Sequence, residues 1–250
     1  MRIAVAGATG TVGSPVSALL VSRGHEVIGL TRADGVDLVT GAGLDGALDG
    51  VDVVVDLTSV STTSAKVSAE FFGTVTRRLL AEETNAGVGH HLALSIVGCD
   101  LVGGGYYAGK VLQESLIGKG PVPWTVLRAT QFHEFARQIA DRGRMGPVIA
   151  CPVVATQPVA VQEVALALAE LAERPPAGRV PDQGGPQVES LVDMVKAYAA
   201  ARGITTPVIP VTLPGRSWSR MRQGSLLPTA GAHLGDQTFA DWLASASARP

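Results

Sequence analysis

Short apolar runs alternate with longer segments of helical periodicity along the first half of the chain. The runs at 2–6, 26–30, 51–56, 92–97 and 125–128 predict strands, and the segments 14–22, 64–86 and 110–117 between them predict helices. Strands that alternate with helices favour right-handed crossovers and a parallel sheet covered on both faces. The pattern therefore predicts an α/β doubly wound fold.

The pattern is less regular elsewhere. A short strand is predicted at 36–39 and a helix at 44–48, while helices are predicted at 163–173, 189–201 and 238–244. The stretches 207–213 and 214–227 are predicted to be irregular. We interpret the second half as partly completing the sheet and partly forming a small lobe.

Three glycines directly follow the first predicted strand. Gly7, Gly10 and Gly13 have the spacing Gly-x-x-Gly-x-x-Gly, and a helix is predicted to begin at Ser14. A strand, a tight turn and a helix start place open backbone N–H groups and the positive end of the helix dipole at one point. The loop residues Gly7, Thr9, Gly10, Thr11, Val12 and Gly13 are therefore predicted to bind the pyrophosphate of a dinucleotide in a Rossmann fold.

The end of the second predicted strand bears on the choice of dinucleotide. A carboxylate there binds the ribose hydroxyls of NAD, whereas this chain has Thr31 and Arg32. An arginine can bind a 2′-phosphate through charge-assisted hydrogen bonds, which favours NADP. Asp34 and Asp37 are close in sequence and either could serve the ribose of NAD, so NAD is the alternative.

The ends of the later strands are predicted to border the same cofactor, because ligands of open parallel sheets bind beyond the carboxyl ends of the strands. The predicted cofactor contacts there are Leu57, Thr58, Ser59, Ser95, Lys110, Thr130 and Phe132.

Tyr106 and Lys110 are four residues apart and share a helix face if the helix begins by Tyr106. A lysine ammonium beside a phenol lowers the pKa of the phenol, and Ser95 could orient a substrate oxygen. Ser95, Tyr106 and Lys110 are therefore the predicted catalytic residues. The alternative is that Lys110 pairs with Glu114 on an exposed helix and that the tyrosines only fasten the loop.

Tyr107, Gln131 and His133 are predicted to line the substrate pocket. His133 is an alternative proton donor, because an unperturbed imidazole titrates near neutral pH. It could instead be a satisfied polar residue in the core of the lobe, with Phe132 and Phe135 as its apolar neighbours.

Composition excludes several other classes. The chain has 250 residues, 46% hydrophobic and 17% charged, with a net charge of −2, which favours a large core and gives no basic face for nucleic acid. Cys99 and Cys151 are too few for a disulfide framework, and His90-His91, placed just before a strand, lacks further ligands for a metal. No apolar run approaches the length of a membrane span, so we expect a soluble cytoplasmic protein that does not bind membranes.

Several segments together resemble the atypical short-chain dehydrogenase/reductases, in the NmrA-like NAD(P)H-binding branch. They are the glycine loop, Ala93–Gly98, Tyr106-Tyr107-x-x-Lys110-x-x-Gln113-Glu114 and Pro123–Phe132. The resemblance continues at 159–165, 213–215 and 238–243, so it spans essentially the whole chain. The resemblance implies one NAD(P)-binding Rossmann domain over 1–250, with substrate-lobe segments mainly within 131–160 and 204–235. It places Ser95, Tyr106 and Lys110 where catalytic members have their serine, tyrosine and lysine.

The functional hypothesis is an NADPH-dependent reductase that transfers hydride to a carbonyl, a quinone or an activated double bond of a small, largely apolar substrate. The alternatives are a non-catalytic NADP(H) sensor that acts through a protein partner, and a redox-neutral isomerase or cyclase on the same fold. The expected partner is a small-molecule substrate, and the expected assembly is a monomer or a homodimer.

Overall fold

The computed structural model describes residues 1–247. The chain divides into two compact units. The first comprises Met1–Arg128 and Val161–Val180, and the second comprises Ala129–Ala160 and the chain from Pro181 onward.

A twisted parallel sheet forms the centre of the first unit. Its strands are β1 (Arg2–Ala6), β2 (Glu26–Leu30), β3 (Val53–Asp56), β4 (His90–Ile96) and β5 (Trp124–Ala129), in the order β5-β4-β3-β1-β2. The pairs β1–β2, β1–β3 and β3–β4 are parallel, and the short β9 (Gly178–Arg179) pairs with β5. The doubly wound α/β fold predicted from the sequence is confirmed.

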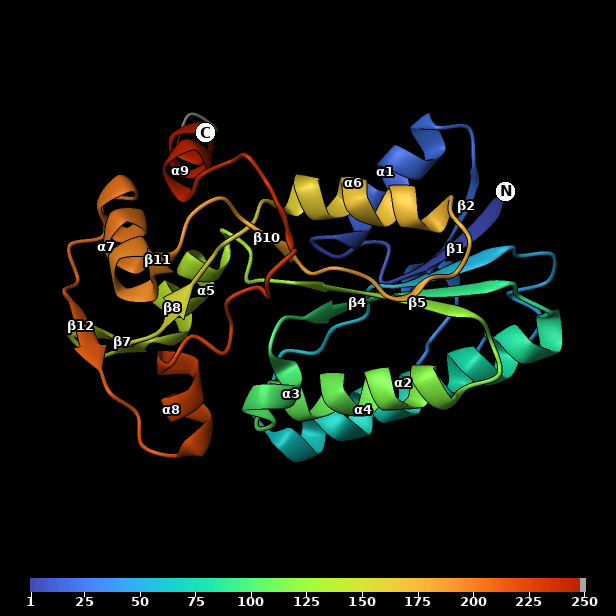
Figure 1. Ribbon diagram of the computed structural model, residues 1–250, viewed down its shortest axis with the longest axis horizontal. Coiled ribbons are helices and arrows are strands. Elements are labelled where there is room, and N and C mark those ends of the chain that lie inside the picture. Colours follow the sequence, from blue (N-terminus) through green and yellow to red (C-terminus); the bar gives the residue numbers. More distant parts are fainter. Residues whose placement is uncertain (248–250) are drawn as a thin grey trace. The chain divides into compact units, whose positions relative to one another are not determined.

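Helices cover both faces of this sheet (Figure 1). One face carries α1 (Gly13–Ser22) and α6 (Val161–Ala172), and the other carries α2 (Ala65–Ala86), α3 (Cys99–Val102) and α4 (Tyr106–Lys119). The Ser64 hydroxyl accepts a hydrogen bond from the Val67 N–H and so caps α2. Within residues 1–247, no helix is long and apolar enough to cross a membrane.

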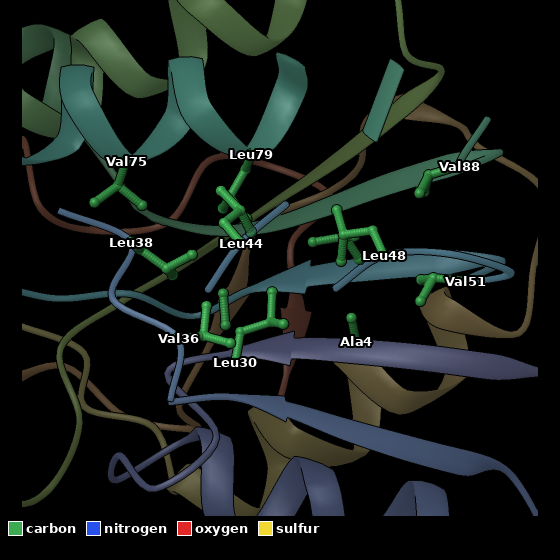
Figure 2. Packing of buried hydrophobic residues seen from close by; sticks show 12 residues of the cluster. Ala4, Leu30, Val36, Leu38, Leu44, Leu48, Val51, Val75, Leu79 and Val88 are labelled. Atoms are coloured by element: carbon green, nitrogen blue, oxygen red, sulfur yellow. The ribbon is translucent and has the colours of Figure 1, made fainter. Parts of the chain in front are cut away.

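The segment after β2 differs from the prediction. Residues 36–39 form no strand and 44–48 form no helix; both lie in turns and irregular backbone. Val36, Leu38, Leu44 and Leu48 are nevertheless buried, and Figure 2 shows them between the sheet and α2. These apolar residues thus belong to the core, but the strand and the helix predicted for them were wrong.

Asp37 explains why this segment is not extended. Its carboxylate accepts hydrogen bonds from the N–H groups of Val39, at 2.8 Å, and Thr40, at 3.2 Å, which closes a turn. The same two backbone bonds hold the pKa of the Asp37 carboxyl below its ordinary value.

The second unit is built from short strands and helices. They are α5 (Phe135–Arg142), β6 (Arg144–Met145), β7 (Val148–Pro152), β8 (Ala155–Thr156), β10 (Gln183–Gly184), β11 (Glu189–Ser190), α7 (Leu191–Ala201), β12 (Val208–Val211), α8 (Arg216–Arg222), β13 (His233–Leu234) and α9 (Phe239–Ser247). Strand β7 pairs with β6 and β12, and α7 packs on β7 and β12. The prediction of irregular backbone at 207–213 and 214–227 was wrong, because these stretches contain β12 and α8.

Candidate functional site

The glycine loop joins β1 to α1 through a tight turn. Gly7 has φ +80°, a conformation that favours glycine, and a Cβ at Gly7 would lie 2.8 Å from the carbonyl oxygen of Leu57. A Cβ at Gly13 would collide with the carbonyl oxygen of Gly7. The loop therefore packs against itself and against the residue that follows β3.

The outer side of the same loop is open. Gly10 is exposed, and among the described residues a Cβ at Gly10 would meet only the Gly7 carbonyl oxygen, at 3.2 Å. Helix α1 begins at Gly13 after the N-cap Val12, whose side chain cannot accept a hydrogen bond. The first N–H groups of α1 therefore have no side-chain cap there, which fits the binding of a pyrophosphate.

The order of the strands reverses at β1, which lies between β2 and β3. This is the position where open α/β sheets bind ligands. Leu57, Thr58 and Ser59 follow β3 at this edge. Thr58 donates hydrogen bonds to the buried Asp56 carboxylate from its N–H, at 3.0 Å, and from its hydroxyl, at 2.7 Å.

The end of β2 presents two opposite charges. Thr31 caps a short 3-10 helix, η1 (Arg32–Asp34), and the Arg32 side chain is exposed. The Asp34 carboxylate accepts a hydrogen bond from the Thr31 hydroxyl, and a Cβ at Gly29 would lie 3.2 Å from it. Asp34 therefore stays beside the strand end, whereas Asp37 closes the turn described above.

Tyr106 is the first residue of α4, so Tyr106 and Lys110 do share one helix. The Tyr106 hydroxyl lies 3.0 Å from Ser59 Oγ, and its ring packs edge-on against Phe72, with 5.5 Å between centroids. The Ser68 hydroxyl donates to the Tyr106 carbonyl oxygen at 2.6 Å and anchors the backbone. Burial raises the pKa of the Tyr106 phenol, and the bond to Ser59 opposes this rise.

Lys110 is buried and hydrogen-bonded inside the protein. Its Nζ donates to the Leu94 carbonyl oxygen at 2.9 Å and to Gln113 Oε1 at 2.8 Å, and it lies 4.3 Å from the centroid of the Phe72 ring. Burial lowers the pKa of Lys110 to about 8, although the Asp56 carboxylate opposes the shift. The alternative of an exposed Lys110 paired with Glu114 is therefore wrong.

Glu114 instead binds Arg128. The guanidinium donates to both carboxylate oxygens, at 2.8 and 2.6 Å, and to Asp100 at 2.9 Å. Although burial opposes it, this pairing holds the pKa of the Glu114 carboxyl below its ordinary value. Ser95 is buried next to this group, with its Oγ 3.9 Å from Cys99 Sγ, and burial followed by the Glu114 charge raises the pKa of that thiol to about 11.

Sequence reasoning missed Asp56 and Gln113. Gln113 Nε2 donates to Asp56 Oδ2 at 2.8 Å, so one buried carboxylate connects Thr58 to the amide that holds Lys110. The spacing of three residues between Lys110 and Gln113 was the available signal, because it places both on one face of α4. Nothing local pointed to Asp56, which lies in a different element.

Three further predicted residues belong to the second unit. The Thr130 hydroxyl donates to the Gln157 carbonyl oxygen at 2.6 Å, Gln131 Oε1 accepts from the Thr156 hydroxyl at 2.7 Å, and Phe132 bridges to Val159. These contacts fasten the residues after β5. Tyr107, in the first unit, is partly buried, and burial raises the pKa of its phenol well above the ordinary value.

His133 is buried in the second unit. Its Nε2 lies 3.2 Å from the Gln237 carbonyl oxygen, and its ring centroid is 5.9 Å from that of Phe239 and 5.8 Å from that of Trp242. This placement favours a role in the core of the lobe over one in proton transfer.

The two adjacent histidines lie within β4 and not before it, which corrects the sequence interpretation. His91 Nδ1 is 2.7 Å from Glu83 Oε1, and His90 Nε2 is 2.9 Å from the Thr125 hydroxyl. Among the described residues, no group of three or more histidine, cysteine, aspartate or glutamate side chains is placed to hold a metal ion.

No protein-family model matches the chain, and no curated protein does. Solved structures do share its fold. MoeE5, in complex with UDP-glucose and NAD, has a TM-score of 0.71 at 18% identity and covers 99% of this chain and 97% of its own. A short-chain dehydrogenase/reductase superfamily protein from Agrobacterium tumefaciens with bound NAD has a TM-score of 0.67 at 17% identity, covering 99% and 96%.

A new type of NADPH-dependent quinone oxidoreductase from Escherichia coli has a TM-score of 0.66 at 16% identity, covering 98% of this chain and 99% of its own. At such identities the likeness concerns the fold alone. The Rossmann-type α/β fold implied by the sequence resemblance is thus confirmed.

Proposed function

We propose that the protein is an NAD(P)H-dependent reductase acting on a carbonyl, a quinone or an activated double bond of a small, largely apolar substrate. One observation carries the proposal. The glycine loop touches the segment after β3 at Leu57, and two residues later Ser59 contacts the Tyr106 hydroxyl at 3.0 Å. The loop that we propose binds the pyrophosphate and the phenol that we propose donates the proton therefore border one edge of the first unit.

The dinucleotide would be held by the loop 7–13 and by Thr58 and Ser59. When bound, it would supply the hydride, and the chain would supply placement and a proton. Tyr106 is the proposed donor, because a phenol is protonated at neutral pH and this hydroxyl lies at the same edge, 3.0 Å from Ser59 Oγ. Ser95 is proposed to orient the substrate oxygen.

NADPH is the proposed form of the cofactor. The support is Arg32, which is exposed directly after β2, where a guanidinium can bind a 2′-phosphate. Asp34 at the same strand end would instead favour the free ribose hydroxyls of NAD, which is the alternative.

A panel of quinones, enones and ketones tests the reaction. We expect the wild-type protein to oxidise NADPH with at least one class, and Tyr106→Phe to lower turnover by roughly 10²–10⁴ while NADPH affinity holds. The matched control is Tyr198→Phe in α7 of the second unit, which should leave turnover unchanged. Turnover that survives Tyr106→Phe intact would remove Tyr106 from the mechanism.

A non-catalytic NADP(H) sensor is the second candidate, favoured by one observation. The hydrogen bonds of Lys110 go to Leu94 and Gln113, and its amine makes none to the Tyr106 hydroxyl among the described residues. A sensor predicts NADPH binding without turnover on any member of the panel, with Tyr106→Phe silent.

A further inference from the structure

The hydroxyl of Tyr106 has a partner that reaches solvent. Its single hydrogen bond among the described residues is to Ser59 Oγ, at 3.0 Å, and Ser59 is exposed. The ring is seated edge-on against Phe72, and Ser68 holds the Tyr106 carbonyl. The phenol is thus fixed at one end by the protein and connected at the other to an exposed hydroxyl.

Lys110 is held in a different direction. A lysine ammonium has three protons to donate. Two go to the Leu94 carbonyl oxygen and to Gln113 Oε1, and the amine lies over the Phe72 ring at 4.3 Å. Gln113 is itself fixed by Asp56, and among the described residues no hydrogen bond joins the Lys110 amine to the Tyr106 hydroxyl.

We propose that Ser59 is the residue through which the Tyr106 hydroxyl regains its proton from solvent after each reduction. The inference rests on the proposed function. In that reaction the substrate carbon receives hydride from NAD(P)H and the substrate oxygen receives the Tyr106 proton. The phenolate then takes the Ser59 hydroxyl proton as Ser59 Oγ takes one from water supplied by solvent, so each turnover consumes one solvent proton. Ser59 acts through Tyr106 and is a positioning residue.

The electrostatics around the phenol agree with this pairing. Burial raises the pKa of Tyr106, the Ser59 hydroxyl lowers it and the Asp56 charge on β3 raises it. On α4, Tyr107 is a neighbouring phenol and Lys110 lies one helical turn further on. The residue that α2 places against the ring is the neutral Phe72. Removing the Ser59 hydroxyl should therefore raise the pKa of Tyr106.

The first experiment uses the protein without cofactor. The tyrosinate absorbance of each variant is measured as the pH is raised. The same titration of that variant carrying Tyr106→Phe is subtracted, so that the difference reports Tyr106 alone. Ser59→Ala should shift the pKa of Tyr106 upward, Ser59→Thr should restore it, and Thr63→Ala, which removes a hydroxyl from the same exposed loop, should leave it unchanged. An unchanged Tyr106 titration in Ser59→Ala would overturn the pairing.

The second experiment measures turnover against pH. At saturating NADPH, Ser59→Ala should lower kcat about tenfold, a part of the range usual for acid–base catalysis, and displace the pH profile. Ser59→Thr should recover the loss. A Ser59→Ala variant with wild-type kcat across the pH range would overturn the proton route. A wild-type protein without turnover would overturn the proposed function and the route with it, while the titration would still decide whether Ser59 controls the acidity of Tyr106.

Discussion

Replacing His91 with leucine should strongly destabilise the first unit, because it leaves a buried carboxylate without its partner. Glu83 on α2 and His91 on β4 are both fully buried, and their one contact joins Oε1 to Nδ1 at 2.7 Å. Among the described residues, neither Glu83 Oε2 nor His91 Nε2 has a hydrogen-bond partner. Breaking a buried pair from one side costs about 3–5 kcal/mol.

That cost corresponds to a fall in melting temperature of roughly 6–20 °C for a chain of this size. Thermal unfolding of His91→Leu, followed by circular dichroism, measures it. The double variant Glu83→Leu/His91→Leu removes both charges and should recover most of the loss, because replacing a whole buried pair with apolar groups is often neutral or stabilising. A single variant within about 1 kcal/mol of wild type, or a double variant as unstable as the single, would refute this reasoning.

The pH dependence of stability gives a second readout of the same pair. Burial lowers the pKa of His91. The Glu83 charge, the hydrogen bond to Glu83 and the Asp56 charge together raise it by more than burial lowers it, so the pKa in the folded protein lies above the ordinary value. The stabilisation that His91 gives the folded state is therefore fully present below about pH 6.5, and it is lost as the pH rises through the pKa of His91 in the folded protein. His91→Leu should remove this alkaline loss of stability.

His90 is the matched control on the same strand. Burial, and then the His91 charge, lower the pKa of His90 to about 4. The stability that depends on a neutral His90 is present above about pH 6.5, and it is lost as the pH falls through the pKa of His90 in the folded protein, near 4. His90→Gln should therefore reduce an acid loss of stability and leave the alkaline side unchanged, the opposite of His91→Leu.

Three further predictions concern the candidate site. Gly10→Val should abolish dinucleotide binding, measured by calorimetry, and leave the circular dichroism spectrum unchanged. The reason is that the new side chain would occupy the open side of the loop. Normal binding by the folded variant would locate the phosphate site elsewhere. The wild-type protein should bind NADPH at least about tenfold more tightly than NADH, since a charge-assisted contact contributes roughly 1.5–3 kcal/mol. Arg32→Ala should remove most of that difference in affinity. Equal wild-type affinities would favour the alternative in which the Asp34 carboxylate binds the ribose hydroxyls. Lys110→Ala should lower turnover and also the melting temperature, because the Leu94 carbonyl oxygen and Gln113 Oε1 each lose a buried hydrogen bond. An unchanged melting temperature would contradict these buried hydrogen bonds.

Local patterns were enough to predict the sheet and the glycine loop. The strands 2–6 and 26–30 have the same bounds in sequence and structure, and α1 begins one residue before its predicted start. Neighbouring residues decide each of these elements, because a strand needs a continuous apolar run, a tight turn needs glycine and a helix needs a start signal. The expectation that Tyr106 and Lys110 lie on one helix was correct for the same reason.

Local patterns were not enough where a segment depends on distant partners. Residues 36–48 contain apolar side chains suited to a strand or a helix, yet they pack as turns because the Asp37 carboxylate closes the backbone and α2 covers the side chains. Strand β12 was missed because its pairing partner, β7, lies more than fifty residues earlier in the chain.

The partners of the charged side chains were decided by the tertiary structure alone. The sequence places Lys110 four residues before Glu114, which suggests an exposed ion pair. The fold instead buries Lys110, whose amine donates hydrogen bonds to the Leu94 carbonyl oxygen of β4 and to Gln113 Oε1 of α4. It also brings Arg128 of β5 to Glu114. The order of strands in the sheet determines which groups meet in the interior, and a buried charge must pair with whatever that order places beside it.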